Sequence, residues 1–187
     1  STTRTSTAST ASDRTAMNHQ PHYILLPASP AFIALSLIVA FLLNLLPWGQ
    51  WVGVPDFVAL LLVFWSMHQP RKVGIGVAFF MGILMDVHDA AVLGENALAY
   101  TLLSYLAIMI HRRVLWFPIA TQALHVFLLL LVTQVIELIV RLFVGGNFPG
   151  WLYFAESAVA ALLWPFVTWL MLAPQRRAIN RDDNRPL

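Results

Sequence analysis

The stretch FPIATQALHVFLLLLVTQVIELIVRLFV, residues 117–144, decides the fold. Its only charged residues are Glu137 and Arg141. As an α-helix the stretch would be roughly 42 Å long at about 1.5 Å per residue, whereas the hydrocarbon core of a bilayer is about 30 Å thick. The stretch therefore predicts a transmembrane helix that tilts or extends into water.

The rest of the chain has the same apolar character. Of the 187 residues, 59% are hydrophobic and 11% are charged, whereas about a quarter of a soluble domain is charged. We predict an all-α membrane protein, a compact bundle of six transmembrane helices. The helices are expected at residues 30–46, 55–68, 72–87, 96–110, 117–144 and 151–172. The segments 72–87 and 96–110 are short, so a re-entrant hairpin is the alternative for that pair.

Three regions follow from this pattern. Residues 1–27 are predicted to be a flexible N-terminal segment, rich in Ser and Thr. Either its first 16 residues are an artificial remnant before Met17, or they are a native extension. Residues 28–173 form the membrane domain, and 174–187 form a basic cytoplasmic tail.

The basic residues set the predicted orientation. Cytoplasmic loops of membrane proteins are enriched in Lys and Arg. With six crossings and both termini in the cytoplasm, ten of the eleven basic residues lie on that side. They are Arg4, Arg14, Arg71, Lys72, Arg112, Arg113, Arg176, Arg177, Arg181 and Arg185. Because they lie in pairs beside apolar segments, they indicate membrane topology and membrane lipid as a partner, not nucleic acid.

Polar residues recur within the 117–144 helix. His125, Thr133, Glu137 and Arg141 are spaced at multiples of four, which places them on one face of the helix, the polar stripe. A charged side chain facing lipid is costly, so this face should turn toward the bundle interior, a cavity or a partner helix. We favour a structural ion pair between Glu137 and Arg141, at i,i+4. A ligand or proton pathway and a partner interface remain alternatives.

Acidic residues gather near residue 86. Asp86, His88, Asp89 and Glu95 could hold a divalent metal, but no second His lies at ligand spacing, so we predict no metal and either a solvated turn or a structural cap. Asp86 alone is a candidate partner for Arg141. The chain also lacks Cys and the common catalytic motifs. We therefore predict no enzymatic activity and no cofactor.

Small residues mark two possible contact faces. Ser36 with Ala40, and Ala78 with Gly82, have the four-residue spacing that allows helix backbones to approach closely. Packing within the bundle is the favoured interpretation. Docking of another membrane protein is the alternative.

The order of motifs in residues 55–98 resembles the MreD family of bacterial rod-shape-determining proteins. These motifs are PD, LLVFW, QPRKVGIG, AFFMGILMD and LGENAL. The matching positions are Pro55, Asp56, Pro70, Gly74, Gly82, Asp86, Gly94 and Leu98. The resemblance implies structural or partner-facing roles for them. Independently, Asp56 suits a helix cap and Gly94 a turn with positive φ.

The resemblance also implies a function. It implies a non-enzymatic scaffold in the bacterial inner membrane that helps maintain rod shape within the cell-wall elongation complex. The implied partners are MreC, the actin-like MreB, the glycan polymerase RodA and a class B penicillin-binding protein. A groove at the small residues would receive the MreC transmembrane helix. Such proteins are similar in architecture to the substrate-binding subunits of energy-coupling-factor vitamin transporters, so a solute-binding transporter subunit is the alternative.

Overall fold

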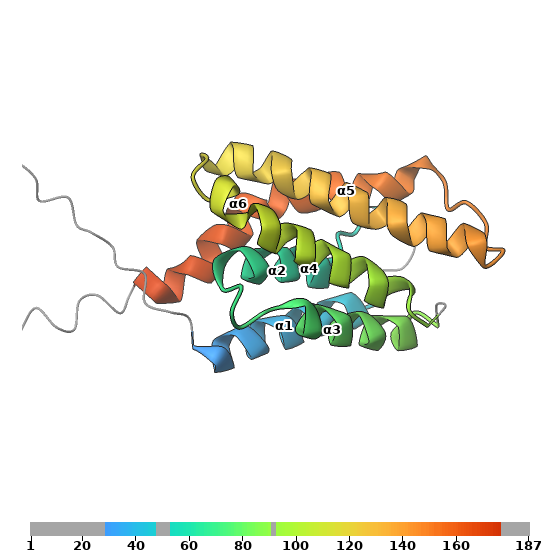
Figure 1. Ribbon diagram of the computed structural model, residues 1–187, viewed down its shortest axis with the longest axis horizontal. Helices are drawn as coiled ribbons and strands as arrows, with labels where there is room; N and C mark the ends of the chain where they lie inside the picture. Colours follow the sequence, from blue (N-terminus) through green and yellow to red (C-terminus); the bar gives the residue numbers. More distant parts are fainter. Residues whose placement is uncertain (1–28, 48–52, 91–92, 177–187) are drawn as a thin grey trace, which may run out of the picture.

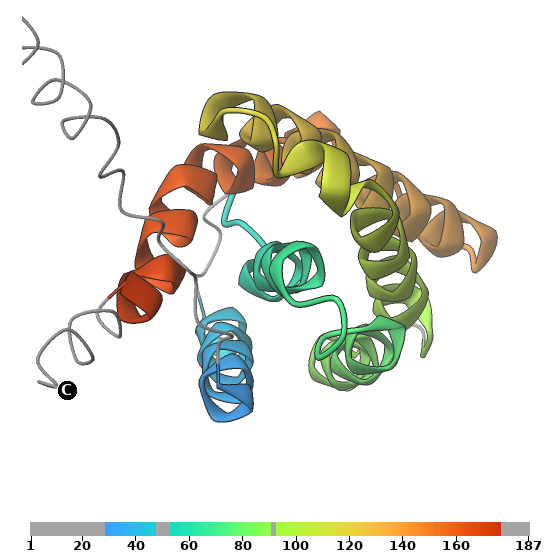
Figure 2. The same ribbon diagram turned by 60° about the vertical axis from the view of Figure 1, so that its left-hand side comes forward.

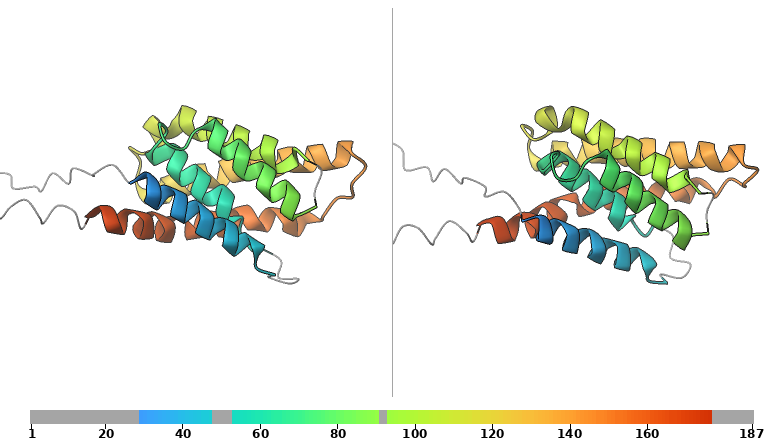
Figure 3. Two further views of the ribbon diagram at one scale, coloured as in Figure 1. Left: turned by 90° about the horizontal axis from the view of Figure 1, so that it is seen from below. Right: turned by 60° about the horizontal axis from the view of Figure 1, so that its bottom comes forward.

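A computed structural model describes residues 29–47, 53–90 and 93–176, and all of its regular structure is helical (Figure 1). The helices are α1 (Pro30–Leu45), α2 (Phe57–His68), α3 (Ile75–His88), α4 (Glu95–Val114), α5 (Ile119–Phe143), the short 3-10 helix η1 (Trp151–Phe154) and α6 (Ala155–Arg176). The described chain begins and ends at the same end of the bundle (Figure 3). We call this the terminal end and the opposite one the far end.

Helix α2 is the centre of the bundle. Its sequence, FVALLLVFWSMH, is apolar on every side, as expected of a helix with no solvent-facing surface. Every residue from Val58 to Met67 is buried. α2 packs against α1, α4 and α6, and Figure 2 shows the other helices arranged around it.

Two polar contacts fix α2 against its neighbours. The indole Nε1 of Trp65 donates to the hydroxyl of Ser36 on α1 at 2.8 Å. The hydroxyls of Ser66 and Ser104, the latter on α4, lie 2.8 Å apart. Because a buried polar group without a partner is costly, these pairs select one rotation of α2 in an otherwise apolar core.

Helices α3 and α4 approach each other closely at Gly82. A Cβ built on Gly82 would lie 2.4 Å from Cα and 2.6 Å from the backbone N of Ala97. Only glycine fits there. This contact is therefore tight packing within the chain, which was the favoured interpretation of the small residues on 72–87.

The six predicted helices are present, with shifted ends. α4 continues to Val114, four residues past its predicted end at 110, since basic residues suit the C-terminal turn of a helix. The predicted stop before Pro174 is wrong, because α6 includes both Pro165 and Pro174. The first residues of the basic tail expected from 174 are therefore helical. The flexible segment predicted for residues 1–27 lies outside the described residues.

Length and apolar character together separate two helices from the others. Among the described residues, Ile119–Phe143 and Trp151–Pro174 are long and apolar enough to cross a membrane. Three more apolar helices are shorter, and α2, with 12 residues, is roughly 18 Å long at about 1.5 Å per residue. The fold is thus an all-helical bundle compatible with a membrane.

Candidate binding pocket

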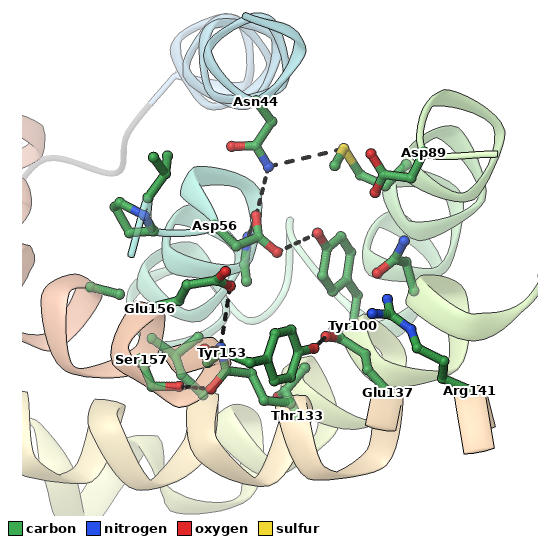
Figure 4. Close-up of a pocket in the computed structure, with 18 residues that line it drawn as sticks. Asn44, Asp56, Asp89, Tyr100, Thr133, Glu137, Arg141, Tyr153, Glu156 and Ser157 are labelled. Atoms are coloured by element: carbon green, nitrogen blue, oxygen red, sulfur yellow. Dashed lines mark hydrogen bonds between the residues drawn. The ribbon is translucent and has the colours of Figure 1, made fainter. Parts of the chain in front are cut away.

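A polar pocket of about 300 Å³ lies at the far end of the bundle (Figure 4). Each of the six α-helices contributes side chains to it or to its edge, so the fold brings together residues distant in sequence. Its lining residues are Asn44, Val54, Pro55, Asp56, Ala59, Met85, Asp89, Asn96, Tyr100, Leu130, Thr133, Gln134, Glu137, Arg141, Tyr153, Glu156, Ser157 and Ala160. Most of these side chains are polar, in contrast to the apolar core.

Asp56 closes one wall of the pocket. As the N-cap of α2, its Oδ1 accepts the backbone N–H of Val58 at 2.9 Å and of Ala59 at 3.0 Å. The same oxygen accepts Asn44 Nδ2 at 2.7 Å, and Oδ2 accepts the Tyr100 hydroxyl. Asp56 therefore joins α1, α2 and α4, and the predicted helix cap is present.

Glu137 and Arg141 enter the pocket from the last turns of α5, but they take different partners. The Tyr153 hydroxyl donates to Glu137 Oε2 at 2.5 Å. Arg141 donates to Glu95 Oε1 from NH2 at 2.8 Å and from Nε at 3.1 Å. The favoured Glu137–Arg141 ion pair is therefore wrong, because the buried Glu95 on α4 engages the guanidinium from a neighbouring helix.

Glu156 faces the pocket from the first turn of α6. Gln134 Nε2 donates to its Oε2 at 3.3 Å and to the carbonyl of Tyr153 at 3.0 Å, and the Gln134 Oε1 accepts the hydroxyl of Ser157. These contacts hold α5 against α6. The sequence prediction missed Glu156 and both tyrosines; a carboxylate within an apolar helix was the available signal for Glu156.

The polar stripe divides along α5. Thr133 lines the pocket together with Glu137 and Arg141. His125 lies more than two turns away toward the terminal end, where its Nδ1 is 2.8 Å from the Thr121 carbonyl oxygen and its ring stacks on Phe117. The pocket therefore uses three of the four predicted positions.

Asp86 caps the next helix in the chain. Its Oδ2 accepts the backbone N–H of Gly94 at 2.8 Å, and its Oδ1 accepts that of Asn96 at 2.7 Å. The candidate pairing of Asp86 with Arg141 is therefore wrong: its carboxylate satisfies the first turn of α4, whose own N-cap, Gly94, has no side chain. In the described ranges no group of three potential ligands could hold a metal.

The four small residues lie inside the bundle. Ser36, Ala40, Ala78 and Gly82 are all buried. Ser36 and Ala40 are on α1, which packs on α2, whereas Ala78 and Gly82 are on α3, which packs on α4. No open groove exists at these positions, because neighbouring helices of the same chain cover them.

Comparisons with known proteins place the chain in a family. A sequence model described as rod shape-determining protein MreD matches residues 28–173. The chain belongs to the MreD family. The rod shape-determining protein MreD of Haemophilus influenzae is 29% identical over 146 residues, covering 75% of this chain and 88% of that protein. No solved structure matches the chain.

Membership in the MreD family gives the protein a role in rod-shape determination, in a family of membrane-associated shape proteins not known as enzymes. The resemblance inferred from residues 55–98 is confirmed. The architectural similarity to vitamin-transporter subunits remains a prediction.

The MreD-family positions lie in several different settings. Asp56 and Asp86 cap helices, and Gly94 has φ +106°, as expected. Pro70 and Gly74 lie in the connection between α2 and α3, with Gly74 as the N-cap of α3. Leu98 points out of the bundle with 52% of its surface exposed. Pro55 lines the pocket beside Asp56, and Gly82 packs on α4.

A double-mutant cycle tests the observed ion pair in this MreD-family protein. We expect Glu95→Gln and Arg141→Met to couple by about 1–3 kcal/mol, since contacting charged residues interact on that scale, and Glu95 is 2% exposed. The measurement is thermal unfolding in detergent. The matched cycle pairs Asp86→Asn with Arg141→Met, and a coupling as large in that control would refute the observed pairing.

Proposed function

We propose that the protein is a non-enzymatic scaffold of the cell-wall elongation complex, which holds MreC through the single transmembrane helix of that partner. Membership in the MreD family is the observation that carries this proposal. Support also comes from the described helices, which present wide apolar surfaces on their outer sides. RodA, the class B penicillin-binding protein and MreB would belong to the same complex.

The proposed topology has six crossings in the inner membrane, with both termini in the cytoplasm. Arg71, Lys72, Arg112 and Arg113 follow α2 or end α4, at the same end as the start of α1. Cytoplasmic ends carry the excess of basic residues, so the terminal end is assigned to the cytoplasm, where it faces MreB and anionic lipid. The pocket then opens outward.

The proposed docking face lies along α1 and α3. Helix α1 packs mainly on α2, and α3 mainly on α4, so the outer side of each is left without a helix from the described chain. Large apolar side chains cover these outer sides. They are Leu35, Ile38, Val39 and Leu42 on α1, and Ile75, Phe79, Phe80 and Val87 on α3. The partner helix is therefore placed on this face and not in the groove expected at the small residues, which are buried inside the bundle.

Site-specific photocrosslinking in cells expressing tagged MreC tests this face. A photoreactive residue in place of Leu35 or Phe79 is expected to crosslink to MreC, because the side chains there are more than half exposed and would contact the partner helix. Matched controls are Leu128 on α5, 52% exposed, and Leu162 on α6, 80% exposed. Crosslinks only at the control positions would overturn the docking face, and no crosslink at any position would remove the direct contact.

The alternative function, a solute-binding subunit of a transporter, is not supported by the similarity to known proteins. Its structural requirement is a pocket with convergent polar groups. Such groups are present, and they come from the helix ends and not from the loop 145–150. Ligand binding by this pocket is therefore a question separate from the scaffold role.

A further inference from the structure

We infer that the far-end pocket is a binding site for a primary ammonium group, carried by a small diffusible amine or by the ethanolamine headgroup of a membrane lipid. The inference does not depend on MreC binding. It rests on the charge of the pocket, its open acceptor atoms, its aromatic walls and its size.

The charge of the pocket is strongly one-sided. Its lining contains four carboxylates, on Asp56, Asp89, Glu137 and Glu156, and a single cationic side chain, Arg141. That guanidinium already donates two hydrogen bonds to Glu95, a further carboxylate outside the lining. A cation would stabilise the ionised form of these acidic side chains, whereas an anionic ligand such as a free phosphate would be repelled by it.

Two carboxylates offer an oxygen to a ligand. Glu137 and Glu156 each accept a hydrogen bond through Oε2, from Tyr153 and Gln134 respectively. Within the described part of the chain, neither Oε1 has a hydrogen-bond donor, and neither belongs to the fully enclosed atoms that lack a partner. Both glutamates line the pocket, so each Oε1 is available to a ligand there. The Asp56 carboxylate, in contrast, is occupied by donors of its own chain.

A primary ammonium fits these acceptors better than a metal ion does. It has three N–H donors and no acceptor, so it can bond two carboxylate oxygens and one neutral oxygen. Thr133, whose hydroxyl donates to the Leu129 carbonyl, supplies a neutral acceptor in the lining. The described residues include no group of three potential metal ligands.

Aromatic rings complete the pocket. Tyr100 and Tyr153 line it, and each directs its hydroxyl to a carboxylate (Figure 4). Tyr100 is only 1% exposed, so the half-buried Tyr153 supplies the ring face available to a ligand. The guanidinium carbon of Arg141 already lies 5.9 Å from the centre of the Tyr153 ring. Cations are attracted to aromatic faces, and the pocket volume of about 300 Å³ suits a small ligand or headgroup.

The test uses the full chain in lipid nanodiscs made of phosphatidylcholine, with ethanolamine as the probe. We expect ethanolamine to bind saturably in calorimetry and to raise the unfolding temperature. Choline is expected to bind at least tenfold more weakly, because its quaternary nitrogen has no N–H donor. Glu156→Gln and Glu137→Gln are each expected to weaken ethanolamine binding at least tenfold. The control His125→Gln, at the terminal end and outside the pocket lining, should change binding less than twofold.

A second arm identifies the source of the ammonium group. In nanodiscs containing phosphatidylethanolamine, retention of that lipid on the protein by native mass spectrometry, lost in Glu156→Gln, assigns the site to the lipid headgroup. Binding of free ethanolamine unchanged by that lipid assigns it to a diffusible amine. The inference is overturned if neither form binds, if choline binds equally well, or if the glutamate variants fold and bind normally. If Glu137→Gln does not fold, Glu156→Gln decides the result. MreC crosslinking is measured separately, so the two proposals fail independently.

Discussion

Gly82→Ala is expected to destabilise the protein by about 3 kcal/mol, since overpacking a core position costs about 1–3 kcal/mol and occasionally more. The added Cβ would lie 2.4 Å from Cα and 2.6 Å from N of Ala97, and 2.7 Å from the backbone O of Asn96. All three atoms are backbone, so no side-chain rotation can relieve the contact. Helices α3 and α4 would have to separate along their tightly packed interface.

Thermal unfolding in detergent measures this effect, with an expected fall of roughly 6–12 °C at about 2–4 °C per kcal/mol. The matched control is Gly76→Ala, six residues earlier on the same helix, where an added Cβ meets no atom within 4 Å. That substitution should leave the stability unchanged or raise it by up to about 1 kcal/mol, because Ala favours a helix more than Gly does. Equal unfolding temperatures for the two variants would contradict the close approach at Gly82.

The helices were predictable because each apolar segment is bounded by a local signal. Pro30 opens α1 with Ser29 as its cap, and Asp56 caps α2, so the sequence itself marks those starts. The predicted end before Pro174 failed for a tertiary reason. Proline removes one backbone N–H donor. A helix packed in an apolar bundle can continue beyond the missing hydrogen bond.

The pocket was less predictable than the helices. Periodicity on α5 placed Thr133, Glu137 and Arg141 on one face, which is a property of a single helix. It could not reveal which helix supplies their partners. Glu95 reaches Arg141 from α4, and Tyr153 reaches Glu137 from the 3-10 helix before α6. These pairings depend on how α4 and α6 pack against α5.

Asp86 is a second case in which the sequence did not reveal the partner of a polar side chain. A carboxylate at the end of an apolar helix suggested an ion pair, since a buried charge needs a partner. Its partners are instead backbone N–H groups of Gly94 and Asn96, eight and ten residues further along the chain. The left-handed turn at Gly94 directs the start of α4 back onto α3, which makes this cap possible.

Asp56→Ala is expected to have the largest effect of any single polar substitution in the protein, a loss of about 3–5 kcal/mol. Removing an N-cap side chain costs about 0.5–2 kcal/mol, and here the amides of Val58 and Ala59 lose their acceptor. The Tyr100 hydroxyl and the Asn44 amide also lose their hydrogen-bond acceptor. A buried donor left without a partner costs about 1–3 kcal/mol, and Tyr100 is only 1% exposed.

Two matched variants separate these contributions in detergent unfolding. Ser29→Ala removes the cap of α1, a single hydrogen bond of 3.3 Å at an exposed position, and should cost less than about 1 kcal/mol. Asp56→Asn keeps one acceptor oxygen for the helix amides, so its cost should fall between those of the two alanine variants. A cost for Asp56→Ala no larger than that for Ser29→Ala would mean that Asp56 acts only as a cap. A larger cost, partly recovered in Asp56→Asn, would show that this carboxylate holds α1, α2 and α4 together at the wall of the pocket.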